Sequence, residues 1–306
     1  MATIGYLVLR SAFALAEQIA PEMTGRAAFE VFCRTPDPSR ISPREASALR
    51  EAAPFMAEAR HHWIQTGNGY VVAHEFRARS LGRTPTVLVL HGWRSRTQHM
   101  RTIVEDLRRE GFRVICLDMP GHGMSPGRKL NLALAVAAVR ATADWFGPFH
   151  AIVGHSFGGA VAVSAVAGSI RGVAPVETDR LVLVSAPSSM PAIFQDFARF
   201  LGLGAKTQVA LARQVERVAG QPLETYVAAE QLRVLGIPTL AIHAPDDKEV
   251  PFEEAQRFEA AGPHVTLMRA PGRGHRRILA DSEVAEAIAR FALGEAVEAV
   301  RPILEG

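Results

Sequence analysis

A short apolar run followed by Gly154-His155-Ser156-Phe157-Gly158 constrains the fold more than any other segment. The run is Ala151-Ile152-Val153, and small and apolar residues continue over positions 159–163. This pattern predicts a buried strand, a sharp turn and a helix, with glycines on both sides of the serine because the turn leaves no room for Cβ atoms there. Such a turn holds the serine hydroxyl clear of the backbone at a helix start, where amide groups favour negative charge. Ser156 is therefore a candidate nucleophile.

Other apolar runs predict the sheet to which this strand belongs. Residues 70–76 alternate like an edge strand, and further strands are expected at 86–90, 113–117, 181–184, 239–243 and 265–268. Helices are expected at 97–110, 132–146 and from 281 onward. Strands that alternate with helices indicate an α/β fold with a doubly wound, mostly parallel sheet.

The alternation is absent from two segments. Residues 188–232 predict two or three helices with no strand between them, which we expect to form a small helical cap. Residues 1–65 are expected to form a helical extension packed on the core, and the core itself is expected to comprise residues 66–187 and 233–306. In the cap, one apolar face recurs at helical spacing, and it either packs the cap onto the core or lines a substrate pocket. That face consists of Ile193, Phe194, Phe197 and Leu201.

Charge and cysteine content exclude several classes of protein. The net charge is only +3, and the arginines are scattered rather than gathered into a basic tract, so we expect no nucleic-acid partner. The two cysteines, Cys33 and Cys116, form no disulfide framework, which favours a reducing, cytoplasmic location. No Cys/His cluster with metal-ligand spacing occurs, and His61 and His62 are interpreted as surface residues without partners.

The N-terminal stretch over residues 2–20 is apolar and predicts a helix. It lacks a basic leader and a small-residue cleavage site, so we do not expect a signal peptide. Arg10 and Glu17 interrupt it before it reaches the roughly 18 apolar residues that a membrane span needs. We expect an amphipathic helix that packs on the domain, with peripheral membrane contact as the alternative.

Chemically active residues follow the predicted strands. Because functional groups of open α/β sheets gather at the carboxyl ends of the strands, we expect them to lie close together. A serine hydroxyl needs an adjacent base, for which His275 is preferred over His122 and His243. A carboxylate must then orient the imidazole, and by location both Asp246 and Asp247 qualify. Asp118 is interpreted as a structural acid that orders the turn after its strand.

Five motifs follow the predicted strands, in the order His91-Gly92-Trp93, Asp118-Met119-Pro120-Gly121-His122-Gly123-Met124-Ser125, Gly154-His155-Ser156-Phe157-Gly158-Gly159, Asp247-Lys248-Glu249-Val250-Pro251 and Gly274-His275. With these motifs in this order, the chain resembles the α/β-hydrolase superfamily, specifically its serine esterase/lipase-like branch, over roughly residues 66–295.

The resemblance implies roles for individual residues. It selects Asp247 as the acid, three residues before the Val of Val-Pro, with Asp246 in reserve. An oxyanion donor is expected at the backbone N–H of Phe157, directly after the nucleophile. The second donor, by resemblance, is the N–H of Trp93. The candidate substrate pocket comprises His91, Gly92, His155, Ile193, Phe194 and Phe197.

We therefore expect cofactor-free hydrolysis of a small carboxylic ester with an apolar acyl or alcohol part, through an acyl-serine intermediate. Thioesterase or acyltransferase activity of the acyl-coenzyme A type, cofactor-free haloperoxidase-like activity and a non-catalytic binding role are the alternatives. Arginines cluster near the site in sequence and form either an anion-binding group or a solvated rim. They are Arg94, Arg96, Arg101, Arg273, Arg276 and Arg277.

Overall fold

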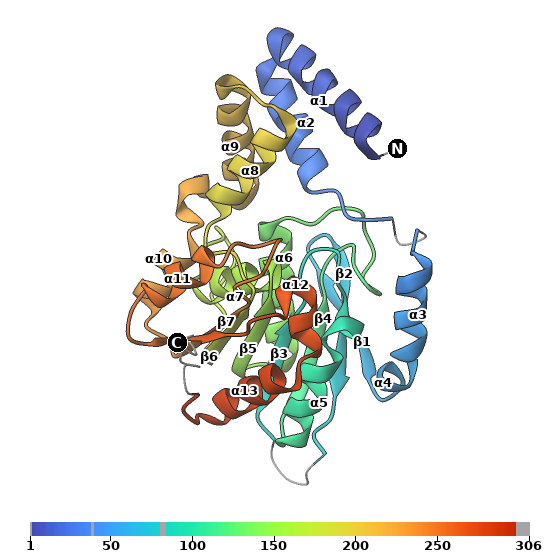
Figure 1. Ribbon diagram of the computed structural model, residues 1–306, viewed down its shortest axis with the longest axis vertical. Helices are drawn as coiled ribbons and strands as arrows, with labels where there is room; N and C mark the ends of the chain where they lie inside the picture. Colours follow the sequence, from blue (N-terminus) through green and yellow to red (C-terminus); the bar gives the residue numbers. More distant parts are fainter. Residues whose placement is uncertain (1, 38–39, 80–83, 298–306) are drawn as a thin grey trace, which may run out of the picture.

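An eight-stranded sheet forms the centre of the molecule (Figure 1). The computed structural model describes residues 2–37, 40–79 and 84–297 of the 306-residue chain. Along the sheet the strand order is β1-β2-β4-β3-β5-β6-β7-β8, and neighbours from β4 to β8 are parallel. Strand β2 is antiparallel to both β1 and β4. The strands are β1 (Arg60–Thr66), β2 (Gly69–Phe76), β3 (Thr86–Leu90), β4 (Arg113–Asp118), β5 (Phe149–His155), β6 (Thr178–Val184), β7 (Thr239–His243) and β8 (Val265–Arg269).

Helices cover both faces of this sheet, because alternate side chains of each buried strand point to opposite sides. Leu88 and Leu90 share a core with α6 (Leu132–Phe146) and α7 (Phe157–Val166). Val87 and Val89 share a second core with α5 (Arg101–Arg109) and α13 (Ser282–Leu293). The predicted α/β fold with a doubly wound, mostly parallel sheet is confirmed.

The remaining helices flank the sheet or join its strands. They are α3 (Pro43–Glu51), α4 (Ala53–Ala57), α10 (Ala228–Leu235), α11 (Glu253–Glu259) and α12 (Gly274–Arg277), with short 3-10 turns at Thr97–Met100, Leu223–Thr225 and Ile278–Ala280. Within the described ranges, no helix combines the length and the apolar character needed to cross a membrane.

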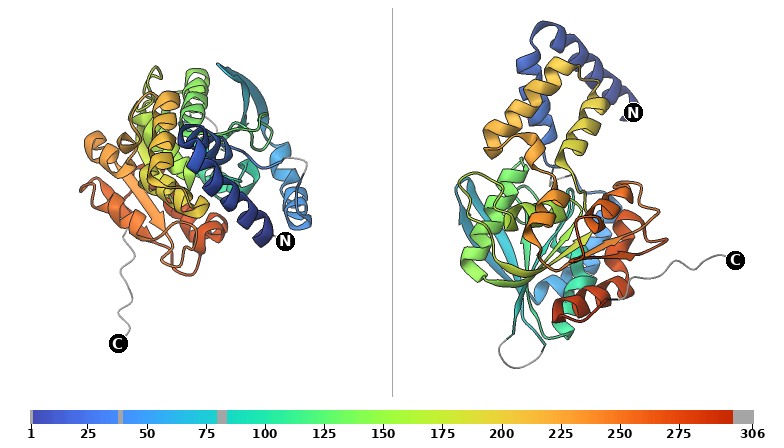
Figure 2. Two further views of the ribbon diagram at one scale, coloured as in Figure 1. Left: turned by 90° about the horizontal axis from the view of Figure 1, so that it is seen from above. Right: turned by 90° about the vertical axis from the view of Figure 1, so that its left-hand side faces the viewer.

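Four helices, which we call the upper helices, lie together beyond one end of the sheet (Figures 1 and 2). They are α1 (Ala2–Ile19), α2 (Pro21–Phe32), α8 (Met190–Leu201) and α9 (Ala205–Ala219). Helix α2 packs along α9, and α1 contacts α2 and α8. Two polar contacts support this packing: Glu22 pairs with Arg213 at 2.7 Å, and Glu17 accepts a hydrogen bond of 2.6 Å from the N–H of Gly204.

The expectation that residues 1–65 form helices packed on the core differs from the structure in two ways. Helix α2 packs on α9 and α1 packs on α8, and the Phe32 ring of α2 stacks on Phe194 of α8. Residues 60–66 form strand β1, and β2 is therefore an interior strand rather than an edge. Strand β1 pairs with β2 through backbone hydrogen bonds, which polar side chains do not prevent.

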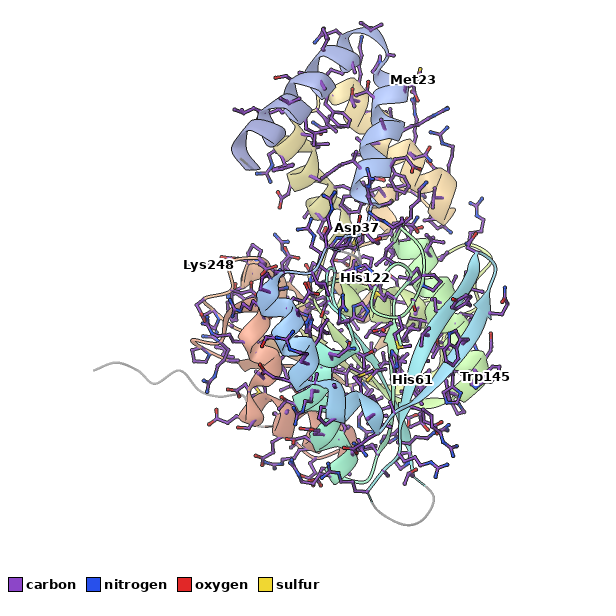
Figure 3. All side chains as sticks on the ribbon, turned by 90° about the vertical axis from the view of Figure 1, so that its right-hand side faces the viewer. Met23, Asp37, His61, His122, Trp145 and Lys248 are labelled. Atoms are coloured by element: carbon purple, nitrogen blue, oxygen red, sulfur yellow. The ribbon has the colours of Figure 1, made fainter. Side chains whose placement is uncertain are left out.

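The interpretation of His61 and His62 as surface residues without partners is wrong (Figure 3). Both are half-buried on β1, and the antiparallel register places them beside side chains of β2. The Nδ1 atoms of His61 and His74 are 2.7 Å apart, and Nε2 of His62 lies 2.9 Å from the Glu75 carboxylate. Cross-strand pairing supplies partners that a polar sequence segment does not reveal.

Candidate active site

Ser156 occupies a strained turn between β5 and α7, as the sequence predicts. Its φ of 53° and ψ of −127° are unusual for a residue with a side chain. The flanking glycines permit the turn: a Cβ on Gly158 would lie 2.5 Å from the carbonyl oxygen of Leu90, and one on Gly154 would lie 2.5 Å from that of Gly158. Backbone strain of this kind costs about 1–3 kcal/mol and persists where the surrounding structure holds it.

His275 and Asp247 meet this serine from two other strand ends. Nε2 of His275 lies 3.0 Å from Oγ of Ser156. Nδ1 of His275 lies 2.8 Å from Oδ2 of Asp247, so the imidazole donates its Nδ1 proton to the carboxylate and leaves Nε2 free to accept from the serine. Asp247 follows β7, and His275 lies in α12 after β8.

Hydrogen bonds keep the Asp247 carboxylate ionised. Oδ1 accepts from the N–H groups of Glu249 at 2.8 Å and Val250 at 2.9 Å. Burial raises the pKa of Asp247, but the hydrogen bonds from His275 and from these two amides outweigh it and lower the pKa to about 2. Asp246 has another environment: it is more exposed, and it accepts a hydrogen bond of 2.7 Å from Gly272.

His155 holds the backbone of His275 in place. Its Nε2 donates a hydrogen bond of 2.9 Å to the carbonyl oxygen of His275, and the two rings are 4.9 Å apart. Burial, and secondly the neighbouring His275, lower the pKa of His155 to about 3, so its imidazole is neutral at pH 7. The expectation placed His155 in the substrate pocket; only 3% of it is exposed, and it lies beneath the site.

The loop after β3 passes directly against the serine. A Cβ on Gly92 would lie 2.8 Å from the Cβ of Ser156. Trp93 follows, and its ring meets that of Phe157 edge-on at 5.6 Å. Phe157 is the first residue of α7, so its N–H has no acceptor inside the helix. The N–H of Trp93 has no hydrogen-bond partner among residues 2–37, 40–79 and 84–297.

Two histidines fix the shape of this loop. His91 donates from Nδ1 to the carbonyl oxygen of Gly92 at 2.8 Å and accepts at Nε2 from the N–H of Met119 at 3.0 Å. Burial, and secondly the nearby His122, lower the pKa of His91 to about 3. His91 therefore joins two loops below the site rather than lining a substrate pocket as expected.

His122 and His243, the alternative bases, are also bonded to other groups. His122 lies between the sheet and the upper helices (Figure 3). It accepts at Nε2 from the N–H of Arg94 at 3.1 Å and donates at Nδ1 to the carbonyl oxygen of Pro120 at 3.1 Å. His243 donates to the carbonyl oxygen of Val250 at 2.9 Å. Both histidines hold loop backbone.

Asp118 orders the turn after β4, and it is fully buried. Oδ1 accepts from the N–H of Thr97 at 2.9 Å and from its hydroxyl at 2.8 Å, while Oδ2 accepts from His74 at 2.9 Å and from the N–H of Met124 at 2.8 Å. Burial raises the pKa of Asp118, but the hydrogen bond and the charge of His74 outweigh it and hold the pKa well below its usual range.

The apolar residues expected in the pocket lie on α8. Phe194 is buried, whereas Ile193 and Phe197 are half-buried. Phe32 on α2 is not among the residues predicted from the sequence, yet its ring stacks on that of Phe194 at 4.3 Å and meets that of Phe197 edge-on at 5.1 Å. Phe29 and Phe32, three residues apart, indicated an apolar helix face but not what covers it.

The arginines near the site are mostly paired with carboxylates of this chain. Arg96 lies 3.3 Å from Glu45, Arg273 lies 2.7 Å from Asp281, and Arg276 contacts both oxygens of the Glu249 carboxylate at 2.8 and 3.1 Å. These pairs favour a solvated rim over an anion-binding group. Within the described part of the chain, no group of three or more His, Cys, Asp or Glu side chains is placed to hold a metal ion.

Residues 87–289 match the profile of the Alpha/beta hydrolase family. The chain belongs to the alpha/beta hydrolase family. Its relatives include the pimeloyl-[acyl-carrier protein] methyl ester esterase of Xanthomonas campestris pv. campestris, which is 27% identical over 251 residues, or 69% of this chain and 96% of the relative. The esterases among its relatives support an enzyme of the carboxylesterase type.

Solved structures share the fold. Est1E from Butyrivibrio proteoclasticus superposes with a TM-score of 0.59 at 20% identity, over 76% of this chain and 98% of Est1E. The esterase EaEST from Exiguobacterium antarcticum superposes with a TM-score of 0.57 at 16% identity, over 76% of this chain and 100% of EaEST. The family match begins at residue 87, so α1 to α4, β1 and β2 precede it.

Proposed function

We propose that this chain hydrolyses a small carboxylic ester through an acyl-serine intermediate, with Ser156, His275 and Asp247 as its catalytic triad. The observation that carries the proposal is the unbroken series of short contacts, 3.0 Å from Ser156 to His275 and 2.8 Å from His275 to Asp247. Family membership adds support, and so does a relative named as a methyl ester esterase.

The proposed reaction has two halves. In the first, Oγ of Ser156 attacks the ester carbonyl carbon while its proton passes to Nε2 of His275, and the Asp247 carboxylate stabilises the imidazolium. The N–H groups of Trp93 and Phe157 bind the negative oxygen of the tetrahedral intermediate. His275 then protonates the alcohol oxygen as the bond to it breaks. In the second half, water attacks the acyl-serine by the same route and releases the acid.

This chemistry orients the substrate. His275 must protonate the leaving alcohol, so the alcohol lies on the His275 side of the serine. The acyl group then extends away from His275, toward the half-buried ring of Trp93. Because the proposed oxyanion donors act through their main chain, the half-buried ring of Trp93 is available to contact an apolar acyl group, whereas the Phe157 ring is buried behind it.

The experiment is hydrolysis of p-nitrophenyl esters of increasing acyl length by the wild type, Ser156→Ala and the control Ser47→Ala. Ser47 is a serine on α3, where its hydroxyl bonds the side chain of Glu51. We expect hydrolysis by the wild type and Ser47→Ala, and none above background by Ser156→Ala. A fluorophosphonate should add its mass to the peptide containing Ser156. Undiminished hydrolysis by Ser156→Ala would exclude the mechanism.

Two points from the sequence stay predictions: the expected cytoplasmic location, and the alternative interpretation in which α1 makes peripheral membrane contact. Liposome flotation of the full chain, compared with a chain lacking residues 1–20, tests the second.

A further inference from the structure

The side chain of Phe32 reaches the site from outside the family-matched region. Its ring centroid lies 6.3 Å from that of Trp93, the residue proposed to bind the oxyanion. The same ring stacks on Phe194 and meets Phe197 edge-on. Helix α2, the loop after β3 and helix α8 each contribute one half-buried aromatic residue here: Phe32, Trp93 and Phe197. Together these residues form a patch of incompletely covered aromatic surface near Ser156. An apolar group bound at Ser156 would cover part of this surface.

A small apolar cavity adjoins Phe32. It has a volume of about 20 Å³, enough for about one water molecule and too small for an alkyl chain. Phe32 lines the cavity and also contacts Trp93, which does not line it, so the Phe32 ring adjoins both the cavity and the site. Its walls include Phe29, Phe32, Leu132, Met190, Phe194 and Tyr226.

The backbone next to Phe32 is fixed to the core. The N–H of Leu130 donates to the carbonyl oxygen of Cys33 at 2.8 Å, and the N–H of Thr35 donates to the carbonyl oxygen of Arg128 at 3.1 Å. The far side of α2 packs on α9. These attachments hold the backbone of α2, and the rings of Phe194 and Phe197 pack against the Phe32 ring, so that ring can act as a wall.

We propose that Phe32 is a specificity-determining residue that ends the acyl site and restricts this enzyme to esters of short acyl chains. The proposal rests on the proposed function. Removing the ring joins the cavity to the site, and each further methylene of a bound chain then gains apolar contact. One methylene in a hydrophobic pocket is worth about tenfold or more in specificity.

The test compares kcat/KM for p-nitrophenyl decanoate with that for p-nitrophenyl acetate. In Phe32→Ala we expect this ratio to rise by about tenfold or more, and in Phe32→Leu by less. The control is Val31→Ala, a neighbouring apolar residue of α2 that is 39% exposed, for which the ratio should equal that of the wild type. A variant that only loosened the fold would lower both activities without favouring the long chain.

A second measurement does not depend on turnover. Decanoate binding to Ser156→Ala, measured by calorimetry, should tighten about tenfold when Phe32→Ala is added. An unchanged ratio and unchanged decanoate affinity in folded Phe32 variants would overturn the proposal even if Ser156 is the nucleophile. Hydrolysis that survives Ser156→Ala would instead overturn the proposed function, while the binding measurement would still decide the role of Phe32.

Discussion

The substitution Asp247→Asn tests the proposed triad, because backbone N–H groups fix the orientation of the new side-chain amide. Oδ1 of Asp247 is held by the N–H groups of Glu249 and Val250, so in the variant the amide oxygen must occupy that position. The amide NH2 then replaces Oδ2, which lies 2.8 Å from Nδ1 of His275. Facing a donor, Nδ1 must become the acceptor, and the imidazole proton moves to Nε2. His275 can then no longer accept the proton of Ser156.

The expected loss of kcat is about 10⁴-fold, since the wrong tautomer removes the general base. That factor corresponds to about 5 kcal/mol of transition-state stabilisation. The free energy of unfolding should fall by a smaller amount than this. Because the folded pKa of Asp247 is lowered to about 2, its ionisation contributes up to about 2 kcal/mol of stability. That contribution is complete above about pH 4 and disappears as the pH falls toward 2. The free energy of unfolding of the variant should therefore lack this fall between pH 4 and pH 2.

The assay is p-nitrophenyl butyrate hydrolysis at pH 7, with urea unfolding between pH 2 and pH 7 to follow stability. Asp246→Asn is the matched control, because Asp246 is adjacent, carries the same charge and is more exposed. Its kcat should change by no more than about fivefold. Near-normal activity in Asp247→Asn together with a large loss in Asp246→Asn would refute the assignment of the acid.

Three further predictions concern the strain, the buried acid and the support of the base. Ser156→Gly should have a free energy of unfolding about 1 kcal/mol higher than Ser156→Ala in urea, because glycine tolerates the φ of 53° and the relieved strain exceeds the extra entropy that glycine has when unfolded; equal or lower stability of Ser156→Gly would contradict strain of that size. Asp118→Ala should lose about 3 kcal/mol or more in the same assay, because the donors of Thr97, His74 and Met124 are left unpaired; a loss below about 1 kcal/mol would contradict this. His155→Phe should lower kcat about tenfold with little change in KM, since the carbonyl oxygen of His275 loses its donor; an unaltered kcat would show that His155 does not position the base.

The sheet and the site geometry were accessible from the sequence because each depends on local signals. Buried parallel strands appear as continuous apolar runs, and the carboxyl ends of parallel strands meet at one edge of the sheet. Ser156, Asp247 and His275 each follow such a run, so their convergence required no knowledge of long-range packing. The choice of Asp247 over Asp246 depended on the resemblance, whereas the structure separates them by the contact with His275.

Features that depend on long-range pairing were not accessible. Strand β1 contains polar residues and an exposed tryptophan, Trp63, so its side chains carry no buried-strand pattern. The partners of His61 and His62 exist only in the register with β2. Phe32 contacts Trp93 across 61 positions, because α2 turns back over the strand ends. Helical spacing indicates an apolar face but does not say which element will cover it.

The attachment of α2 has a practical consequence for how the protein can be divided. An expression product trimmed to the matched residues 87–289 would lack this helix, and the aromatic side chains of α8 that stack on it would face solvent. Loop 128–130 would also lose its hydrogen-bonded neighbour. Exposed apolar surface of that kind promotes aggregation. The family-matched segment, residues 87–289, is therefore shorter than the segment that must be expressed to keep this apolar surface covered.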